Sequence, residues 1–508
     1  MPSARLNFRL PFHPLRNMEK TKRFLWISAL GVSLLLLGLR FINLNADFPY
    51  RINNSADVYT DEGWWSNSAI IHQLTGQWIL EGDFNPVIYL PVFPIVQAAS
   101  FSLFGLSLGA ARLSIVLFSI LACLVTYGLV ARMEGRLTAS VVLLLLSANF
   151  ALFGFSRLAL LELPMTCFIL LSFLFAACTH FPKAIYLSLA VLSFCLALLT
   201  KTTALFALPS LLFLIWIKQP TWRKGLVASL VVLAGIVLLA GIYYLAMIHW
   251  YQNDLNWLFQ NTTLKPHENA LTSLTPKAIY GAVYRVVGRG ILLDGVIVPI
   301  ILIAFPLLLV FYRQVRKNPL VLASSAWIVI TFTALAMRGY LPLRYYLPLI
   351  FPFCILFSYL ILHFIRRLQP SRWSYIPALV ITGVWILSFI NVAQYLAVPQ
   401  YSYQEMADDI ERQILASEEP RPLILGSVAN TLTLATGIPS INTTMGTRDL
   451  QWKLAHYQPN FYVSLGWNDE IIQQIEEVYD VENLSRYDVF DNYRQGMQFF
   501  FFRLVKKL

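Results

Sequence analysis

Long apolar segments recur along this chain from near its start to about residue 396. Eleven of them approach or exceed the roughly 20 residues that a helix needs to cross a bilayer. They span residues 24–44, 110–131, 137–156, 158–178, 184–200, 203–217, 225–248, 292–312, 320–337, 345–365 and 375–396. Only 13% of the 508 residues are charged, against about 25% in soluble domains. The sequence therefore predicts a polytopic α-helical membrane protein with about 11 transmembrane helices.

The orientation of these helices depends on one ambiguous stretch, 87–108, which is apolar but contains Pro91 and Pro94. If this stretch does not cross, every short link rich in Lys and Arg lies on the same side as the basic N-terminus. Such links are typical of the cytoplasmic face. We therefore expect 87–108 to be interfacial or re-entrant, the N-terminus to be cytoplasmic, and the protein to lie in the inner or plasma membrane. The net charge of +11 then reflects topology and not a nucleic-acid partner.

This threading leaves three sizeable parts outside the cytoplasm. Two are outer loops at about 45–109 and 249–291 within a membrane domain at 1–396. The third is the polar tail 397–508, which has an amphipathic helical pattern at Tyr403–Ile414 and strand-like runs at Pro422–Val428, Phe461–Leu465 and Met497–Val505. Pieces of this order and length predict a small extracytoplasmic α/β domain.

Two adjacent carboxylates, Asp61 and Glu62, lie in the first outer loop beside Tyr59, Trp64 and Trp65. Ionisable groups next to a bilayer are costly to desolvate and often mark function. A pair framed by aromatic rings is a candidate to bind a divalent metal or to accept a proton from a hydroxyl.

Other ionisable side chains fall on the same predicted face: Arg157, Glu162, Lys201, Arg344 with Tyr345, and His249. Basic side chains at helix ends also reach towards lipid headgroups without any further role, but that explanation gives no reason for outer carboxylates. Lys201 and Arg344 are suited to neutralise a phosphate, and a nearby carboxylate is suited to deprotonate an attacking hydroxyl. Together these groups could displace a lipid phosphate from a sugar.

Several short motifs resemble one known superfamily. They are Tyr59-Thr60-Asp61-Glu62-Gly63, Pro91-Val92-Phe93-Pro94 with Ala111-Arg112-Leu113, Ser156-Arg157 through Glu162-Leu163-Pro164, Leu199-Thr200-Lys201, and Arg344-Tyr345-Tyr346-Leu347-Pro348. Their order is similar to that in C-type glycosyltransferases that use polyprenyl-phosphate sugars. The nearest likeness is to the protein O-mannosyltransferase and lipid A aminoarabinose transferase superfamily. Two departures are Thr202-Thr203 after Lys201, where Gly-Pro is common, and Glu162, where Asp is commoner.

The resemblance implies the C-type fold and an inverting transfer from an undecaprenyl- or dolichyl-phosphate sugar, without a metal or weakly assisted by one. It assigns Asp61 as the catalytic base and Glu62 as its neighbour, assisting it or contacting the acceptor. Lys201, Arg344 and Tyr345 would bind the donor phosphate. Arg157 and Glu162 would shape the sugar pocket, and we add Tyr59 and His249 as candidates for its wall.

The expected partners are membrane lipids, a polyprenyl-phosphate-linked sugar donor and an acceptor hydroxyl on a lipid, a glycan or a protein. A divalent metal near Asp61 and Glu62 stays open as a cofactor. Two other classes also stay open: a lipid-linked-sugar flippase or transporter, and a noncatalytic protein of envelope polysaccharide assembly. The first should carry ionisable groups near the bilayer midplane, and the second should tolerate loss of Asp61.

Overall fold

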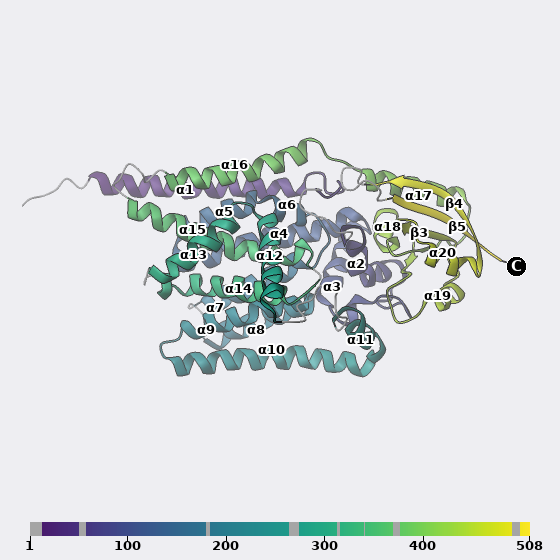
Figure 1. Cartoon of the computed structure of the whole chain (residues 1–508), viewed down its shortest axis with the longest axis horizontal. Helices are drawn as coiled ribbons and strands as arrows, with labels where there is room; N and C mark the ends of the chain where they lie inside the picture. Colours follow the sequence, from purple (N-terminus) through teal and green to yellow (C-terminus); the bar gives the residue numbers. More distant parts are fainter. Residues whose placement is uncertain are drawn as a thin grey trace, which may run out of the picture.

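The computed structural model describes residues 13–49, 57–178, 183–263, 274–311, 315–339, 341–368, 376–489 and 498–507. Up to residue 397 the described chain is almost entirely helical, and its long helices form one bundle (Figure 1). The α-helices of this part, long and short, are α1 (His13–Gly38), α2 (Asp57–Thr75), α3 (Val92–Phe104), α4 (Leu108–Glu134), α5 (Arg136–Ala148), α6 (Phe150–Phe155), α7 (Glu162–Ala177), α8 (Lys183–Thr200), α9 (Leu208–Ile217), α10 (Trp222–Trp250), α11 (Gln252–Leu258), α12 (Pro276–Leu293), α13 (Ile297–Phe311), α14 (Pro319–Ala336), α15 (Ile350–Leu368) and α16 (Ile376–Ala397). A 3₁₀ segment, η7 (Leu343–Leu349), leads into α15.

Within the described ranges, six helical stretches are long and apolar enough to cross a membrane. They are Leu108–Glu134, Lys183–Thr200, Trp222–Trp250, Pro319–Ala336, Leu343–Ile365 and Leu379–Ala416. Shorter apolar helices coincide with the other predicted spans, namely Trp26–Phe41, Arg136–Ala148, Glu162–Ala177, Thr202–Ile217 and Ile297–Val310. The helical membrane class is confirmed, and the number of eleven crossings stays a prediction.

The surface of α10 shows what surrounds the bundle. Leu230, Val237, Leu238 and Leu245 along this helix are each at least 52% exposed. A continuous apolar strip of this kind is unstable in water, but it is favourable against lipid chains. The 29 residues of α10 rise about 43 Å at 1.5 Å per residue, which exceeds the hydrocarbon thickness of about 30 Å.

The ambiguous stretch 87–108 contains the 13-residue helix α3. Pro91 caps its start and Pro94 lies in its first turn, where a proline costs no hydrogen bond. Gly105 ends it with φ +80°, a conformation that glycine adopts without strain. The helix is only about 20 Å long, which is short for a crossing. Its interfacial or re-entrant position stays a prediction.

A five-stranded sheet follows the bundle, at the right of Figure 1. Its strands are β1 (Ile424–Leu425), β2 (Ser440–Ile441), β3 (Phe461–Leu465), β4 (Tyr479–Asp488) and β5 (Gln498–Lys506), in the order β2-β1-β3-β5-β4. Strand β1 is parallel to β2 and β3, while β5 is antiparallel to β3 and β4. The accompanying helices are α17 (Ser402–Ala416), α18 (Ala429–Thr436), α19 (Leu450–Tyr457) and α20 (Asp469–Glu476). The strand expected at Phe461–Leu465 has those bounds.

The phenylalanine run of β5 explains why both faces of this sheet are covered. Phe499 and Phe501 are buried in the core that continues into the bundle, whereas Phe500 and Phe502 are buried in a second core under α19 and α20. Successive side chains of a strand point to opposite faces, so an uninterrupted apolar strand needs a layer on each side. The boundary of this part at residue 397 and its extracytoplasmic position stay predictions.

Helix α18 packs directly on α2. Thr431 Oγ1 accepts a hydrogen bond from Gly63 N at 3.0 Å and donates to the Thr60 carbonyl at 3.2 Å, and Trp64 Nε1 donates to Ser427 O at 2.7 Å. A Cβ on Gly63 would lie 2.1 Å from Thr431 N. Glycine at this position therefore permits a backbone approach that no side chain would allow.

A buried polar network holds the same two parts together deeper inside. Asn430 Nδ2 donates to Asn67 Oδ1 at 2.8 Å, and Asn67 Nδ2 donates to Asp83 Oδ2 at 3.3 Å. Lys453 Nζ donates to the Asn442 carbonyl at 2.7 Å and lies 3.8 Å from Asp83 Oδ1. Burial raises the pKa of Asp83 and lowers that of Lys453. Each buried charge depends on the other, so the network fixes the C-terminal part against α2.

Candidate functional site

Four segments distant in the sequence bring two carboxylates and two cations together. Asp61 comes from α2, Glu162 begins α7, Lys201 follows the last residue of α8, and Arg344 lies in η7. We call these four residues the charge cluster. All are buried, with exposed fractions of 1–8%.

Arg344 connects the two carboxylates of the charge cluster. Its Nη2 lies 2.8 Å from Asp61 Oδ2, and its Nε lies 3.3 Å from Glu162 Oε1. Lys201 Nζ donates to the same Glu162 oxygen. The sequence placed these groups on one face of the membrane, and the structure brings them into contact.

Helix ends favour the charges at two of these positions. Glu162 lies in the first turn of α7, where the backbone N–H groups favour an anion. Lys201 follows the C-terminal end of α8, where the unpaired carbonyls favour a cation. The two helix ends therefore stabilise the ion pair in the orientation observed.

Tyr345 covers the cations of the charge cluster with its ring. Lys201 Nζ lies 4.5 Å from the ring centroid, and the guanidinium carbon of Arg344 lies 5.6 Å from it. Both distances are within the range of cation–π attraction. The ring thus restrains the two groups that the sequence suggested for phosphate binding.

Glu62 faces away from the charge cluster, although it is adjacent to Asp61. Its carboxylate accepts two hydrogen bonds from Arg112, from Nε at 2.9 Å and from Nη2 at 2.8 Å. The N–H of Ala159 donates to it as well, at 2.8 Å. Arg112 Nη1 also donates to the carbonyls of Leu44 and Ala46. This arrangement holds α2 against α4 and against residues 44–46, which precede α2 in the sequence.

Arg112 is the partner that the sequence interpretation left without a role. It lies within the apolar helix α4, whose other residues in that stretch are small or apolar. An arginine within a membrane span is costly and needs a buried partner. That cost is the signal that could have identified Arg112 as a partner of one of the outer carboxylates.

Arg157 lies in a different environment from the charge cluster. Its guanidinium donates to the carbonyls of Ile42 and Asn43 and lies 5.3 Å from the rings of Phe153 and Tyr395. These contacts hold the link after α1 against α6 and α16. Its role in a sugar pocket stays a prediction.

The last two candidates for the sugar pocket are His249 and Tyr59. His249 is exposed in the last turn of α10, with its ring 6.2 Å from that of Trp250. The backbone of Tyr59 belongs to α2, but its side chain lies outside the described residues. Both assignments stay predictions.

The residues around Asp61 and Glu62 do not fit a divalent cation. Both oxygens of Glu62 are held by Arg112, and Asp61 Oδ2 is held by Arg344. In the ranges that the structure describes, no group of three or more His, Cys, Asp or Glu is arranged to hold a metal ion. The chemistry proposed below therefore uses no metal.

Glu162 keeps one oxygen without a partner. Its Oε2 is buried and, within the described part of the chain, makes no hydrogen bond. An unsatisfied buried oxygen of a carboxylate is costly. It gives the charge cluster an acceptor for a hydroxyl group of a bound ligand.

A cavity of about 530 Å³ lies beside the 3₁₀ segment that carries Arg344. Arg285 and Arg289 of α12 contribute positive charge to its wall, and Ile291, Leu292 and Leu341 contribute apolar surface. Cations next to apolar side chains suit a ligand with an anionic head and a hydrocarbon tail.

Comparison with known proteins agrees with this architecture. The family described as dolichyl-phosphate-mannose-protein mannosyltransferase matches residues 86–248, about a third of the chain. Two structures of ArnT from Cupriavidus metallidurans, in the apo state and bound to undecaprenyl phosphate, both give a TM-score of 0.63 at 14% and 15% identity. Each alignment covers 94% of this chain and 97% of ArnT.

A more distant structure shares the fold. The oligosaccharyltransferase of Archaeoglobus fulgidus, in complex with zinc and sulfate, gives a TM-score of 0.52 at 12% identity, covering 86% of this chain and 68% of its own. No curated protein sequence matches the chain.

The fold is that of the C-type glycosyltransferases, which are polytopic membrane proteins. Within that fold, the resemblance to the protein mannosyltransferase and aminoarabinose transferase superfamily is confirmed by the family match and by the ArnT structures.

Proposed function

We propose that the protein is an integral-membrane inverting glycosyltransferase. It moves a sugar from a polyprenyl-phosphate donor to an acceptor hydroxyl on the extracytoplasmic face. The observation that carries this proposal is the charge cluster, in which Asp61 contacts Arg344, and Glu162 contacts both Arg344 and Lys201.

The reaction needs a base for the nucleophile and stabilisation for the leaving group. Asp61 accepts the proton of the acceptor hydroxyl, whose oxygen attacks the anomeric carbon of the sugar. The bond from that carbon to the phosphate oxygen breaks, and its electron pair leaves with the polyprenyl phosphate. Lys201 and Arg344 stabilise the negative charge that develops there. A single displacement inverts the anomeric configuration.

Charge balance suggests the order of these events. Without a ligand, the two carboxylates of the charge cluster neutralise its two cations, and Arg344 holds Asp61. A donor phosphate competes with Asp61 for that guanidinium, because phosphate and carboxylate share the same bidentate geometry. Binding of the donor then releases Asp61 to act as a base. Glu162 keeps Lys201 in place meanwhile.

The other members of the site support the donor class. Tyr345 orients both cations through its ring. The cavity lined by Arg285 and Arg289 next to η7 suits the lipid-linked end of the donor. Glu62 has a positioning role, because its ion pair with Arg112 fixes the turn of α2 that carries Asp61.

The test uses purified protein in lipid nanodiscs with radiolabelled polyprenyl-phosphate sugars and candidate acceptors. Release of polyprenyl phosphate is compared for the parent, Asp61→Asn and the control Asp408→Asn, an exposed carboxylate on α17. We expect release by the parent and the control only. Equal release by Asp61→Asn would refute the role of Asp61. Translocation of the lipid without release would favour the flippase.

The orientation is tested separately. The five native cysteines are buried, so a single cysteine at the exposed Gln473 can report the position of the C-terminal part. We expect an impermeant maleimide to label Gln473→Cys in intact cells. Labelling only after the inner face is opened would overturn the proposed topology.

A further inference from the structure

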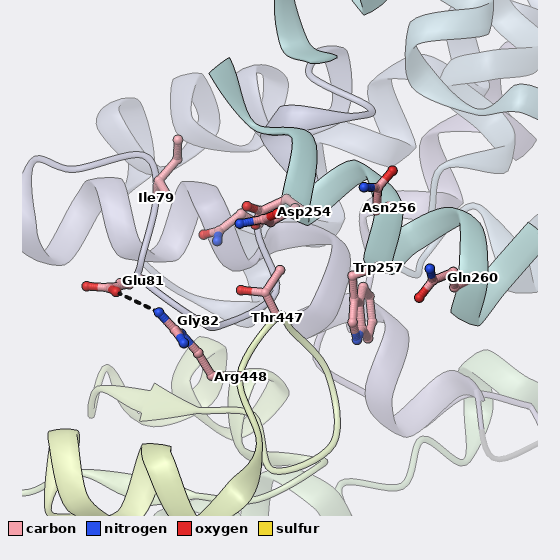
Figure 2. A pocket seen from close by; sticks show the side chains of 11 residues that line it. Ile79, Glu81, Gly82, Asp254, Asn256, Trp257, Gln260, Thr447 and Arg448 are labelled. Atoms are coloured by element: carbon pink, nitrogen blue, oxygen red, sulfur yellow. Dashed lines mark ion pairs between the residues drawn. The ribbon is translucent and has the colours of Figure 1, made fainter. Parts of the chain in front are cut away.

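A second cavity, of about 650 Å³, lies where the first outer loop, the region around α11 and the C-terminal part meet (Figure 2). Its walls come from residues 79–85, 253–260 and 447–448. It is separate from the charge cluster, and none of its lining residues has a role in the proposed reaction.

Amide side chains dominate one wall of this cavity. Asn253, Asn256 and Gln260 are exposed and line it from the α11 side. Among the residues that the structure describes, none makes a hydrogen bond to these three side chains. An amide both donates and accepts, which is the capacity that neighbouring sugar hydroxyls require.

An aromatic ring completes the arrangement. Trp257 lies in the wall between Asn256 and Gln260, and Figure 2 shows its indole beside the loop that carries Thr447. The face of an indole ring is electron-rich. It attracts the polarised C–H bonds of a sugar ring, so a ring and several amides together favour a carbohydrate.

The charges of the cavity disfavour an anionic ligand. Glu81 and Asp254 contribute two carboxylates, against one cation, Arg448. Arg448 is already 3.8 Å from Glu81 and stacks 5.1 Å from the ring of Trp452. Burial raises the pKa of Asp254, so this carboxyl gains from hydroxyl groups that replace lost water. A phosphate would meet net negative charge here.

Aromatic contacts connect the cavity with the helix that carries Asp61. The ring of Trp257 lies 6.2 Å from that of Phe84, which lies 5.5 Å from that of Trp65. Trp65 is four residues from Asp61 along α2, about 6 Å of helix rise. The cavity is therefore two ring contacts away from α2, the helix that carries Asp61.

We infer that this cavity is an acceptor subsite for a neutral, hydroxyl-rich oligosaccharide whose reacting end lies at Asp61. The inference rests on the proposed function and names its acceptor class as a glycan, not a protein side chain or a phosphorylated lipid. The amides bind the hydroxyls, Trp257 stacks on one sugar ring, and the carboxylates exclude phosphorylated chains.

The test measures glycan binding without any donor, so that it does not depend on transfer. Full-length protein in labelled nanodiscs is applied to an array of neutral oligosaccharides of three to six hexoses and their phosphorylated counterparts. We expect the parent and Asp61→Asn to bind at least one neutral glycan. Trp257→Ala and the surface double variant Asn256→Ala/Gln260→Ala should bind about tenfold more weakly.

Trp250→Ala is the matched control, because Trp250 is 65% exposed and is not part of the cavity. It should bind as the parent does. Binding of no neutral glycan, a preference for phosphorylated chains, or unchanged binding by both cavity variants would overturn the inference. Asp61-dependent release of polyprenyl phosphate tests the proposed function independently of these results.

Discussion

Replacing Asp61 and Glu62 one at a time by their amides should give opposite phenotypes. Asp61 belongs to the charge cluster, whereas Glu62 is held by Arg112 and by the N–H of Ala159. We expect Asp61→Asn to lose transfer with the smaller loss of stability, and Glu62→Gln to show the larger loss of stability.

The size of the Glu62 effect follows from its burial. Glu62 is 1% exposed and Arg112 is 5% exposed, so the amide leaves a buried guanidinium without its counter-charge. Breaking such a pair costs about 3–5 kcal/mol. The lower end applies here, because Arg112 keeps its bonds to the carbonyls of Leu44 and Ala46. The amide N–H₂ group also faces one of the guanidinium donors.

The Asp61 effect should fall mainly on the rate. Arg344 retains the carboxylate of Glu162 as a partner after the change, so the loss in the free energy of unfolding should be smaller than for Glu62→Gln. Removal of a general base lowers the rate by about 10²- to 10⁴-fold. Donor binding should persist, because the cations that bind phosphate remain.

Thermal unfolding in nanodiscs and release of polyprenyl phosphate, measured on the same preparations, separate the two effects. The double variant Glu62→Gln/Arg112→Met should recover stability relative to Glu62→Gln, since it removes both buried charges. If Glu62→Gln is as stable as the parent and as inactive as Asp61→Asn, our reasoning is wrong and Glu62 contacts the acceptor.

Four further predictions follow from other contacts. Gly63→Ala should lower the free energy of unfolding by more than about 1 kcal/mol, because its Cβ would lie 2.1 Å from Thr431 N. The control Gly241→Ala has open space around its Cβ and should cause no such loss in thermal unfolding. Lys453→Met should lower stability by about 3–5 kcal/mol by leaving Asp83 unpaired, and Asp83→Asn added to it should restore part of the loss in the same assay. The hydrogen bond from the Tyr487 hydroxyl lowers the pKa of Asp409 in the folded protein. The ionised carboxylate therefore stabilises the fold above the pKa that Asp409 has in the unfolded chain, and this contribution should vanish as the pH falls through its lower pKa in the folded protein. Asp409→Asn should accordingly make the free energy of unfolding less dependent on pH in the acid range. Chelation with EDTA should leave release of polyprenyl phosphate unchanged, and a loss that Mg²⁺ or Mn²⁺ restores would contradict the metal-free reaction.

Much of the membrane architecture could be predicted, because lipid imposes a strong rule. Spans of about 20 apolar residues and one-sided basic links are visible in a single sequence. The convergence of Glu162 and Lys201 also follows in part, since both lie at the predicted outer ends of helices. Their contact with Arg344 could not be predicted, because the sequence gives no information on which helices are neighbours.

The division between Asp61 and Glu62 was missed for a local reason. The sequence interpretation placed the pair in the first outer loop without assigning it a helix, but both residues belong to α2. Neighbouring side chains on a helix point about 100° apart, and Asp61 and Glu62 accordingly contact different arginines, Arg344 and Arg112. With the helix recognised, the second buried carboxylate needs a cation of its own, and Arg112 is the first arginine or lysine that follows Glu62 in the sequence.

The cavity around Trp257 was missed because no motif marks it. Its amides belong to the region around α11, while Glu81 and Arg448 come from parts of the chain more than 150 residues away on either side. Such a surface exists only after the C-terminal part packs against α2 through Gly63 and Thr431. The same packing holds the helix that carries Asp61. If the cavity binds the acceptor glycan, the contact that selects the acceptor also fixes the position of the base, so changes at the Gly63–Thr431 contact should alter glycan binding and transfer together.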